Sequence, residues 1–140
     1  MTRRMSCSMT VDAVRARTKT VTRRHVDTWK DLAPGARLTL VEKAMGLPKG
    51  ARQVVLADVE IVRVSMLRLG LYPSGPYKLS PLDQAELDRE GLGHLTVDEF
   101  LIMWLQSHGY TQWVGLGSHG LAQARHQVYC RRIEWRYLDG

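Results

Sequence analysis

The chain of 140 residues is 44% hydrophobic and 24% charged, an ordinary globular composition that favours one domain over residues 1–140 with a single core. Its net charge of +6 at pH 7 favours a polyanionic partner, with nucleic acid ahead of an anionic membrane. No apolar run is long enough for a secretory signal or a membrane span, so the sequence argues against these classes and predicts a cytoplasmic protein without a membrane partner.

The N-terminal part of the chain predicts a strand and a short helix. Residues 5–9 alternate apolar and small polar side chains, which indicates a strand with Met5, Cys7 and Met9 inward. Thr10 is a suitable N-cap for a helix that ends before the next, strongly basic segment.

That basic segment, residues 17–24, holds four cations and three hydroxyls. In an extended conformation Thr20, Thr22 and Arg24 share one side, and Lys19 lies just before them. Arg supplies a planar fork of donors and Lys a point charge, so the segment suits an anionic ligand. A basic edge strand with solvated charges explains the same pattern equally well.

The middle of the chain predicts a curved sheet. Residues 25–32 indicate a loop whose Trp29 folds back onto the body, and residues 36–43 form a strand after a Pro-Gly turn. Residues 54–69 carry the strongest strand pattern. Their apolar phase moves by one residue after Ile61, which predicts a bulge or bend.

Two helices follow. Ser80 at the N-cap and Pro81 at the first position predict a helix that ends near Glu90, where Gly91 stops it. A capping-box spacing starting at Thr96 begins the second. Its apolar residues fall on one face at i, i+3, i+4, i+7 and i+8: Val97, Phe100, Leu101, Trp104 and Leu105.

The remaining chain predicts a loop and a last strand. Residues 108–127 are rich in glycine, which indicates a flexible loop at the rim of a pocket, and their three scattered histidines lack the spacing of a metal site. Residues 128–138 indicate a strand with two faces: Ile133, Trp135 and Tyr137 inward, and Arg132, Glu134 and Arg136 toward water.

The two cysteines, Cys7 and Cys130, have no neighbouring ligand motif. They are predicted to be reduced core residues rather than a disulfide or a zinc site. No metal and no cofactor are expected. The elements together predict an α+β fold, a small mixed β-barrel with short helices inserted between strands, in preference to an α+β sandwich.

Lys19, Thr22 and Arg24, which follow a short helix, resemble the Gly-x-Lys-x-x-Thr/Ser-x-Arg signature of the ASCH domain family, a branch of the PUA-like superfamily. The glycine position is Arg17 here, and a non-glycine residue carries a steric cost if that turn needs a positive φ. Glu90 and its following glycine and helix resemble a second element of the family. The compact, basic form resembles versions found in bacteriophage genomes, in which case the location would be the host cytoplasm.

The resemblance implies a PUA-like barrel with a cleft that holds RNA or a nucleoside. One small bacterial branch of the family hydrolyses the amide of N4-acetylcytidine with a lysine, a threonine and a glutamate, and the matching positions here are Lys19, Thr22 and Glu90. These three are the predicted catalytic residues. The residues predicted to bind substrate or nucleic acid are Arg17, Thr20, Arg23, Arg24 and Lys43.

Three functions remain open at this point. The protein is an amidohydrolase acting on an acylated base, a non-catalytic module that binds RNA or a nucleotide, or a phage protein that binds a host factor. Lys19 could equally bind phosphate, Thr22 could be an ordinary strand threonine, and Glu90 a surface residue. Loop aromatics could stack bases in a binding module: Trp29, Tyr72, Tyr77, Tyr110 and Trp113. A monomer or a weak dimer is expected.

Overall fold

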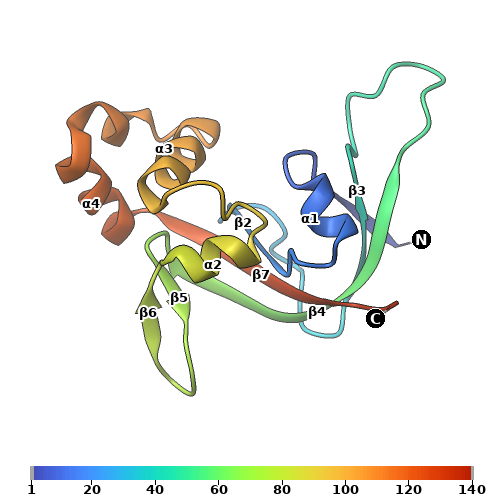
Figure 1. Cartoon of the computed structure of the whole chain (residues 1–140), viewed down its shortest axis with the longest axis horizontal. Coiled ribbons are helices and arrows are strands. Elements are labelled where there is room, and N and C mark those ends of the chain that lie inside the picture. The colour runs from blue at the N-terminus through green and yellow to red at the C-terminus, as the bar shows by residue number, and fades with distance from the viewer. Residues whose placement is uncertain (1, 140) are drawn as a thin grey trace.

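A five-stranded sheet, curled into a half-barrel, forms the centre of the molecule in the computed structural model, which describes residues 2–139 (Figure 1). The strand order is β1-β3-β4-β7-β2; β1 and β3 are parallel and the other neighbours antiparallel. A hairpin of β5 and β6 stands apart. The strands are β1 Arg3–Ser6, β2 Val21–His25, β3 Arg37–Val41, β4 Val55–Arg68, β5 Leu71–Pro73, β6 Leu79–Pro81 and β7 Tyr129–Tyr137.

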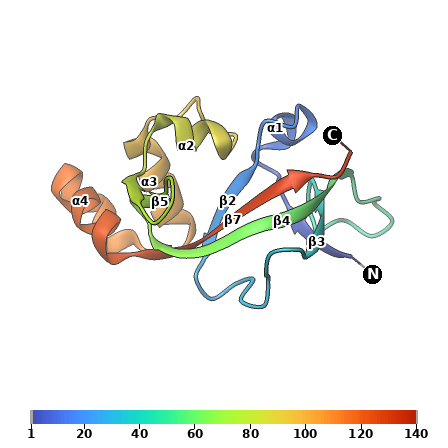
Figure 2. The same cartoon turned by 90° about the horizontal axis from the view of Figure 1, so that it is seen from below.

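Short helices cover the two ends of the long strands β4 and β7 (Figure 2). Helices α2, α3 and α4 gather at one end, and α1 lies at the other with β1 and β3. The helices are α1 Val11–Arg15, α2 Gln84–Arg89, α3 Val97–Ser107, the 3₁₀ helix η1 Thr111–Leu116 and α4 Gly117–Gln127. Within residues 2–139, no helix has both the length and the apolar character needed to cross a bilayer.

The predicted bend in the long strand is confirmed. The register of β4 against β7 shifts between Ile61 and Arg63, which marks a bulge. Ile61 is buried, Val62 is exposed, and Val64 packs partly against the core beyond the bulge. A bulge bends its strand and increases its twist, so this one helps the sheet to curl. The α+β class with a curled sheet and short helices agrees with the predicted small mixed barrel, and the sheet is a half-barrel whose two edges are β1 and β2.

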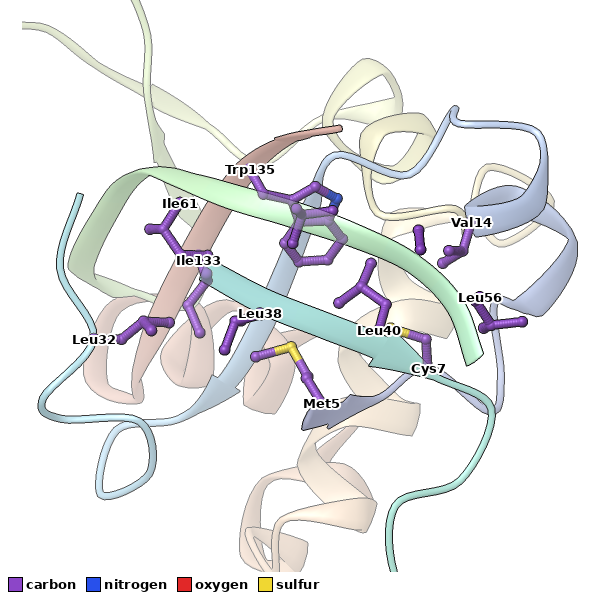
Figure 3. Packing of buried hydrophobic residues seen from close by; sticks show 12 residues of the cluster. Met5, Cys7, Val14, Leu32, Leu38, Leu40, Leu56, Ile61, Ile133 and Trp135 are labelled. Atoms are coloured by element: carbon purple, nitrogen blue, oxygen red, sulfur yellow. The ribbon is translucent and has the colours of Figure 1, made fainter. Parts of the chain in front are cut away.

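Two hydrophobic cores lie on either side of the sheet's middle. The first fills the curl of the half-barrel, where the side chains in Figure 3 point toward one another. It includes Met5, Cys7, Val14, Leu38, Leu40, Ile61, Ile133 and Trp135, and Trp29 packs onto it as predicted. The second joins α2, α3 and α4 and includes Leu87, Phe100, Leu101, Trp104, Leu105, Leu121 and Cys130. Both cysteines are free and buried, as predicted.

Helix α3 agrees with its prediction. The Thr96 hydroxyl accepts a hydrogen bond from the Glu99 backbone N–H, and the Glu99 carboxylate accepts one from the Thr96 backbone N–H. The two bonds complete the capping box. Helix α2, in contrast, begins later than predicted, because Ser80 and Pro81 pair with β5 and Asp83 caps the helix instead. The hydrogen bonds of the hairpin outweigh the local helix-start signal.

Other predictions were wrong in ways that tertiary packing explains. Met9 is 67% exposed rather than inward, since β1 ends at Ser6. Residues 108–127 are not a flexible loop but fold into η1 and α4. Gly120 serves their packing: a Cβ there would lie 2.3 Å from the Trp113 carbonyl oxygen. The glycine signals a close approach of two helices rather than mobility.

Candidate functional site

A cleft of about 190 Å³ opens between the two edge strands of the half-barrel, β1 and β2, and α3 covers one side. Ligand pockets for drug-sized molecules measure about 300–1,000 Å³, so this cleft suits a ligand no larger than a nucleoside. Its lining comprises Ser6 to Thr10, Lys19, Thr22, Arg23, Arg24, Glu90, Leu92, Phe100, Met103, Trp104, Ser107 and His108.

The turn before Lys19 is a Schellman motif. The Thr18 N–H bonds to the Ala13 carbonyl at 2.9 Å and the Arg17 N–H to the Val14 carbonyl at 3.0 Å, which is the pattern that ends a helix with a left-handed residue. That residue is Arg17, with φ of 63°. The position therefore has the conformation that favours glycine, and Arg17 adopts it while pairing with Asp139 at 2.5 Å.

We expect the Arg17→Gly variant to be more stable than Arg17→Ala by about 1 kcal/mol, because both lose the guanidinium but only glycine accepts the positive φ without strain. Urea unfolding of the two variants measures the difference. In the matched pair Arg15→Gly and Arg15→Ala, at the last residue of α1, the order should reverse. Equal stability of the two Arg17 variants would contradict the expectation.

The backbone of Lys19 is held firmly, so its side chain enters the cleft in a defined direction. Its carbonyl accepts hydrogen bonds from the Trp135 indole at 3.1 Å and from the Tyr137 hydroxyl. The side chain is only 4% exposed, and its Nζ donates to the Glu90 carbonyl at 2.5 Å. Burial lowers the pKa of Lys19, although the Glu90 carboxylate opposes that shift. A buried lysine of lowered pKa can act as a general base.

Glu90 reaches Lys19 because the ends of α1 and α2 lie close together. The Thr20 N–H bonds to the Arg89 carbonyl at 2.8 Å, which ties the start of β2 to the last turn of α2. Gly91 has φ of 79°, and a Cβ there would lie 2.8 Å from Ala13 Cβ, so only glycine fits. The Glu90 side chain is 4% exposed, and its Oε2 lies 4.0 Å from Lys19 Nζ.

Thr22 and Arg24 supply the other polar groups of the cleft. Thr22 is buried and lines the cleft. Arg24 donates to the Ser6 carbonyl at 2.6 Å and so connects the two edge strands. Its Nε is buried without a partner in the described part of the chain, which leaves one donor unused. The cleft thus combines a base, a hydroxyl, a carboxylate and an unpaired donor.

Of the residues predicted to bind a ligand, two line the cleft and three lie outside its lining. Arg24 and Arg23 line the cleft, but the Arg23 guanidinium bonds to Glu90 and Glu86. Arg17 pairs with Asp139 outside the cleft, and Lys43 is an exposed residue after β3. Thr20 is half-buried and does not line the cleft.

Several residues of the site were missed in the sequence. Glu86 and Arg132 are buried and pair at 2.6 Å, although Arg132 was predicted to face water. Glu86 lies four residues before Glu90, a spacing that puts both on one helix face and could have indicated it.

An aromatic wall on the cleft was also missed. The Trp104 ring stacks on His108 with centroids 3.9 Å apart, and Tyr110 stacks on Trp104 at 6.0 Å. His108 Nδ1 bonds to the Trp104 carbonyl at 2.7 Å, and burial lowers the pKa of His108. Of the loop aromatics predicted to stack bases, Trp29, Tyr72, Tyr77, Tyr110 and Trp113, none is in the cleft lining. Trp104 and His108 take that position instead.

No group of three His, Cys, Asp or Glu side chains that could hold a metal ion occurs between residues 2 and 139. Compared with known protein families, with curated proteins and with solved structures, the chain gives no match.

Proposed function

We propose that the protein is an amidohydrolase that removes a small acyl group from an acylated nucleobase, with N4-acetylcytidine as the first substrate to test. The observation that carries this proposal is the meeting of Lys19, Thr22 and Glu90 in one small cleft. Support for an ASCH-type, PUA-like barrel comes from the curled sheet and from Lys19, Thr22 and Arg24, which line the cleft at its edge strand.

The charges around the cleft favour an uncharged ligand over a phosphate backbone. Arg23 is neutralised by two glutamates, and Arg17 is paired elsewhere. Among the described residues, Arg23 and Arg24 line the cleft and each keeps a buried Nε without a partner, but only Arg24 has no carboxylate paired with its guanidinium. Nucleic-acid backbones are bound through several free cations, so this lining suits a base or nucleoside better. Trp104 and His108 provide a flat aromatic wall for such a ring.

A chemical route follows from these groups. Neutral Lys19 accepts the Thr22 proton while Thr22 Oγ1 attacks the acyl carbon, and the unpaired donor of Arg24 stabilises the oxyanion. The carbon–nitrogen bond then breaks, and the leaving amine takes the proton back from the Lys19 ammonium. Lys19 then takes a proton from water, whose oxygen attacks the ester carbon. The bond between that carbon and Thr22 Oγ1 breaks, the Lys19 ammonium returns its proton to Oγ1, and the carboxylic acid leaves. Glu90 orients Lys19 throughout.

Turnover tests the proposal. We expect the purified protein to release cytidine and acetate from N4-acetylcytidine, and Lys19→Ala, Thr22→Val and Glu90→Ala to lower kcat/KM by on the order of a hundredfold to ten-thousandfold. Thr20→Val is the matched control, since Thr20 is outside the cleft lining, and it should keep full activity. Acid quenching and mass spectrometry should find an acetylated Thr22.

An inactive, folded wild type would overturn this function. The net charge of +6 specifically favours the second candidate, a module that binds RNA without chemistry. In that case the folded protein should retard RNA, with affinity that falls as salt rises, and Thr22→Val should leave binding unchanged.

A further inference from the structure

A buried charge cluster of four side chains connects Glu90 to the interior: Glu90, Arg23, Glu86 and Arg132. Arg23 Nη1 donates to Glu90 Oε1 at 2.5 Å, and Arg23 Nη2 to Glu86 Oε1 at 3.0 Å. Arg132 Nε donates to Glu86 Oε1 at 2.6 Å. All four side chains are 4% exposed or less. Anions and cations alternate along the cluster, so each carboxylate has a guanidinium beside it.

Stability does not account for this arrangement. Glu86 and Glu90 are four residues apart on the same helical face, where like charges repel. Taking ions out of water is costly, and apolar side chains of similar volume are often as stabilising as a buried ion pair. Stability alone is therefore a weak reason for the cluster.

The cluster fixes the direction of the Glu90 carboxylate. Arg23 holds Oε1, which leaves Oε2 facing Lys19 Nζ at 4.0 Å. Arg23 itself is held at both ends, because its guanidinium contacts Glu86 and its backbone carbonyl accepts from the Trp104 indole at 3.2 Å. Carboxylate, guanidinium and aromatic wall are thus one connected unit beside the cleft.

We propose that Arg23, oriented by Glu86, is a positioning residue that directs Oε2 of Glu90 toward Lys19. The inference rests on the proposed hydrolase function. It gives Arg23 a role that differs from the ligand binding expected of it, since both ends of its guanidinium are occupied by carboxylates.

The cation of Arg23 also acts on Lys19. Within the described residues, the charged and titratable groups that face Lys19 are Glu90 after α2, Arg23 and Arg24 from β2, Cys7 after β1, and Tyr137 from β7, whose hydroxyl bonds to the Lys19 carbonyl. Burial lowers the Lys19 pKa, Glu90 and Cys7 raise it, and the two arginines lower it. Removing the Arg23 charge raises that pKa and leaves less neutral base at a given pH.

Two variants distinguish the effect of Arg23 on the orientation of Glu90 from the effect of its charge on Lys19. For both, kcat and KM for N4-acetylcytidine are measured across pH. Arg23→Lys keeps the cation but loses the fork that bridges two carboxylates. We expect its kcat to fall on the order of tenfold to a hundredfold, with little change in KM or in the pH of the rising limb.

The double variant Arg23→Met with Glu86→Met removes one charge of each sign and leaves Arg132 paired with Glu134 at 2.9 Å. It should lose kcat and also shift the rising limb to higher pH.

Arg136→Gln is the control. Arg136 lies on β7, as Arg132 does, but it forms a pair with Glu60 at the surface. This variant should leave kcat, KM and the pH of the rising limb unchanged. If the wild type is active but both cluster variants keep its kcat and pH profile, the positioning role is wrong and the hydrolase stands. If neither variant folds, the cluster is structural and the inference is overturned. An inactive wild type overturns the proposed function, and this inference with it.

Discussion

The Lys19→Met variant should lose turnover and yet gain about 1–2 kcal/mol in its free energy of unfolding at pH 7, because the wild type keeps a buried base at a cost in stability. Lys19 is 4% exposed, and burial lowers its pKa below that of an ordinary lysine. Methionine fills a similar volume without a charge to bury. Glu90 keeps Arg23 as its partner at 2.5 Å in the variant, so no anion is left uncompensated.

The lowered pKa of Lys19 also predicts how the stability difference between Lys19→Met and the wild type changes with pH. Because the folded state binds the Lys19 proton less tightly than the unfolded chain, wild-type stability rises as pH increases from the folded pKa toward 10.5, the unperturbed value. The stability difference between the variant and the wild type should therefore shrink between pH 7 and pH 10 in urea unfolding. Lys43→Met, at an exposed lysine outside the cleft, should show no such convergence. A Lys19→Met protein clearly less stable than wild type at pH 7 would count against a buried base.

The Glu86→Gln variant should lose about 3–5 kcal/mol of stability near pH 7, the typical cost of removing one partner from a buried ion pair. Glu86 is 1% exposed and accepts from Arg23 at 3.0 Å and from Arg132 at 2.6 Å. Glutamine keeps the shape but leaves two buried guanidinium groups with too little negative charge. Urea unfolding measures the loss.

Lowering the pH should reduce the difference in the free energy of unfolding between the wild type and Glu86→Gln. Burial alone would raise the pKa of Glu86, but the hydrogen bond from Arg132 and the charges of Arg23 and Arg132 outweigh burial and hold that pKa below its usual 4.5. The ionised Glu86 therefore contributes its full stabilisation of the folded state above pH 4.5, and this stabilisation is lost as pH falls through the lowered pKa. Glu60→Gln breaks the exposed pair with Arg136 and should cost at most about 1 kcal/mol. A similar, small loss in both variants would contradict a strong buried network.

Local patterns in the sequence were sufficient for several features. The phase change after Ile61 predicted the bulge, and the spacing from Thr96 to Leu105 predicted α3 with its capping box and buried face. Lys19, Thr22 and Glu90 were selected from short motifs, and the fold brings all three to one cleft. The bulge and the helix depend on residues a few positions apart, whose geometry the backbone itself dictates, whereas Lys19, Thr22 and Glu90 were chosen by their resemblance to a family signature and lie up to 71 positions apart.

Only the tertiary structure decided what covers each face. Alternation along β7 correctly predicted that Arg132 and Ile133 lie on opposite faces of the sheet. Helix α2 places Glu86 against the face of Arg132, so this arginine is buried and paired instead of facing water. For the same reason Arg23 became a partner of two glutamates rather than a ligand-binding cation. The periodicity of a strand tells which side a residue takes. Whether that side meets water or another element depends on contacts between residues distant in sequence, such as Arg23 and Glu90, which are 67 positions apart.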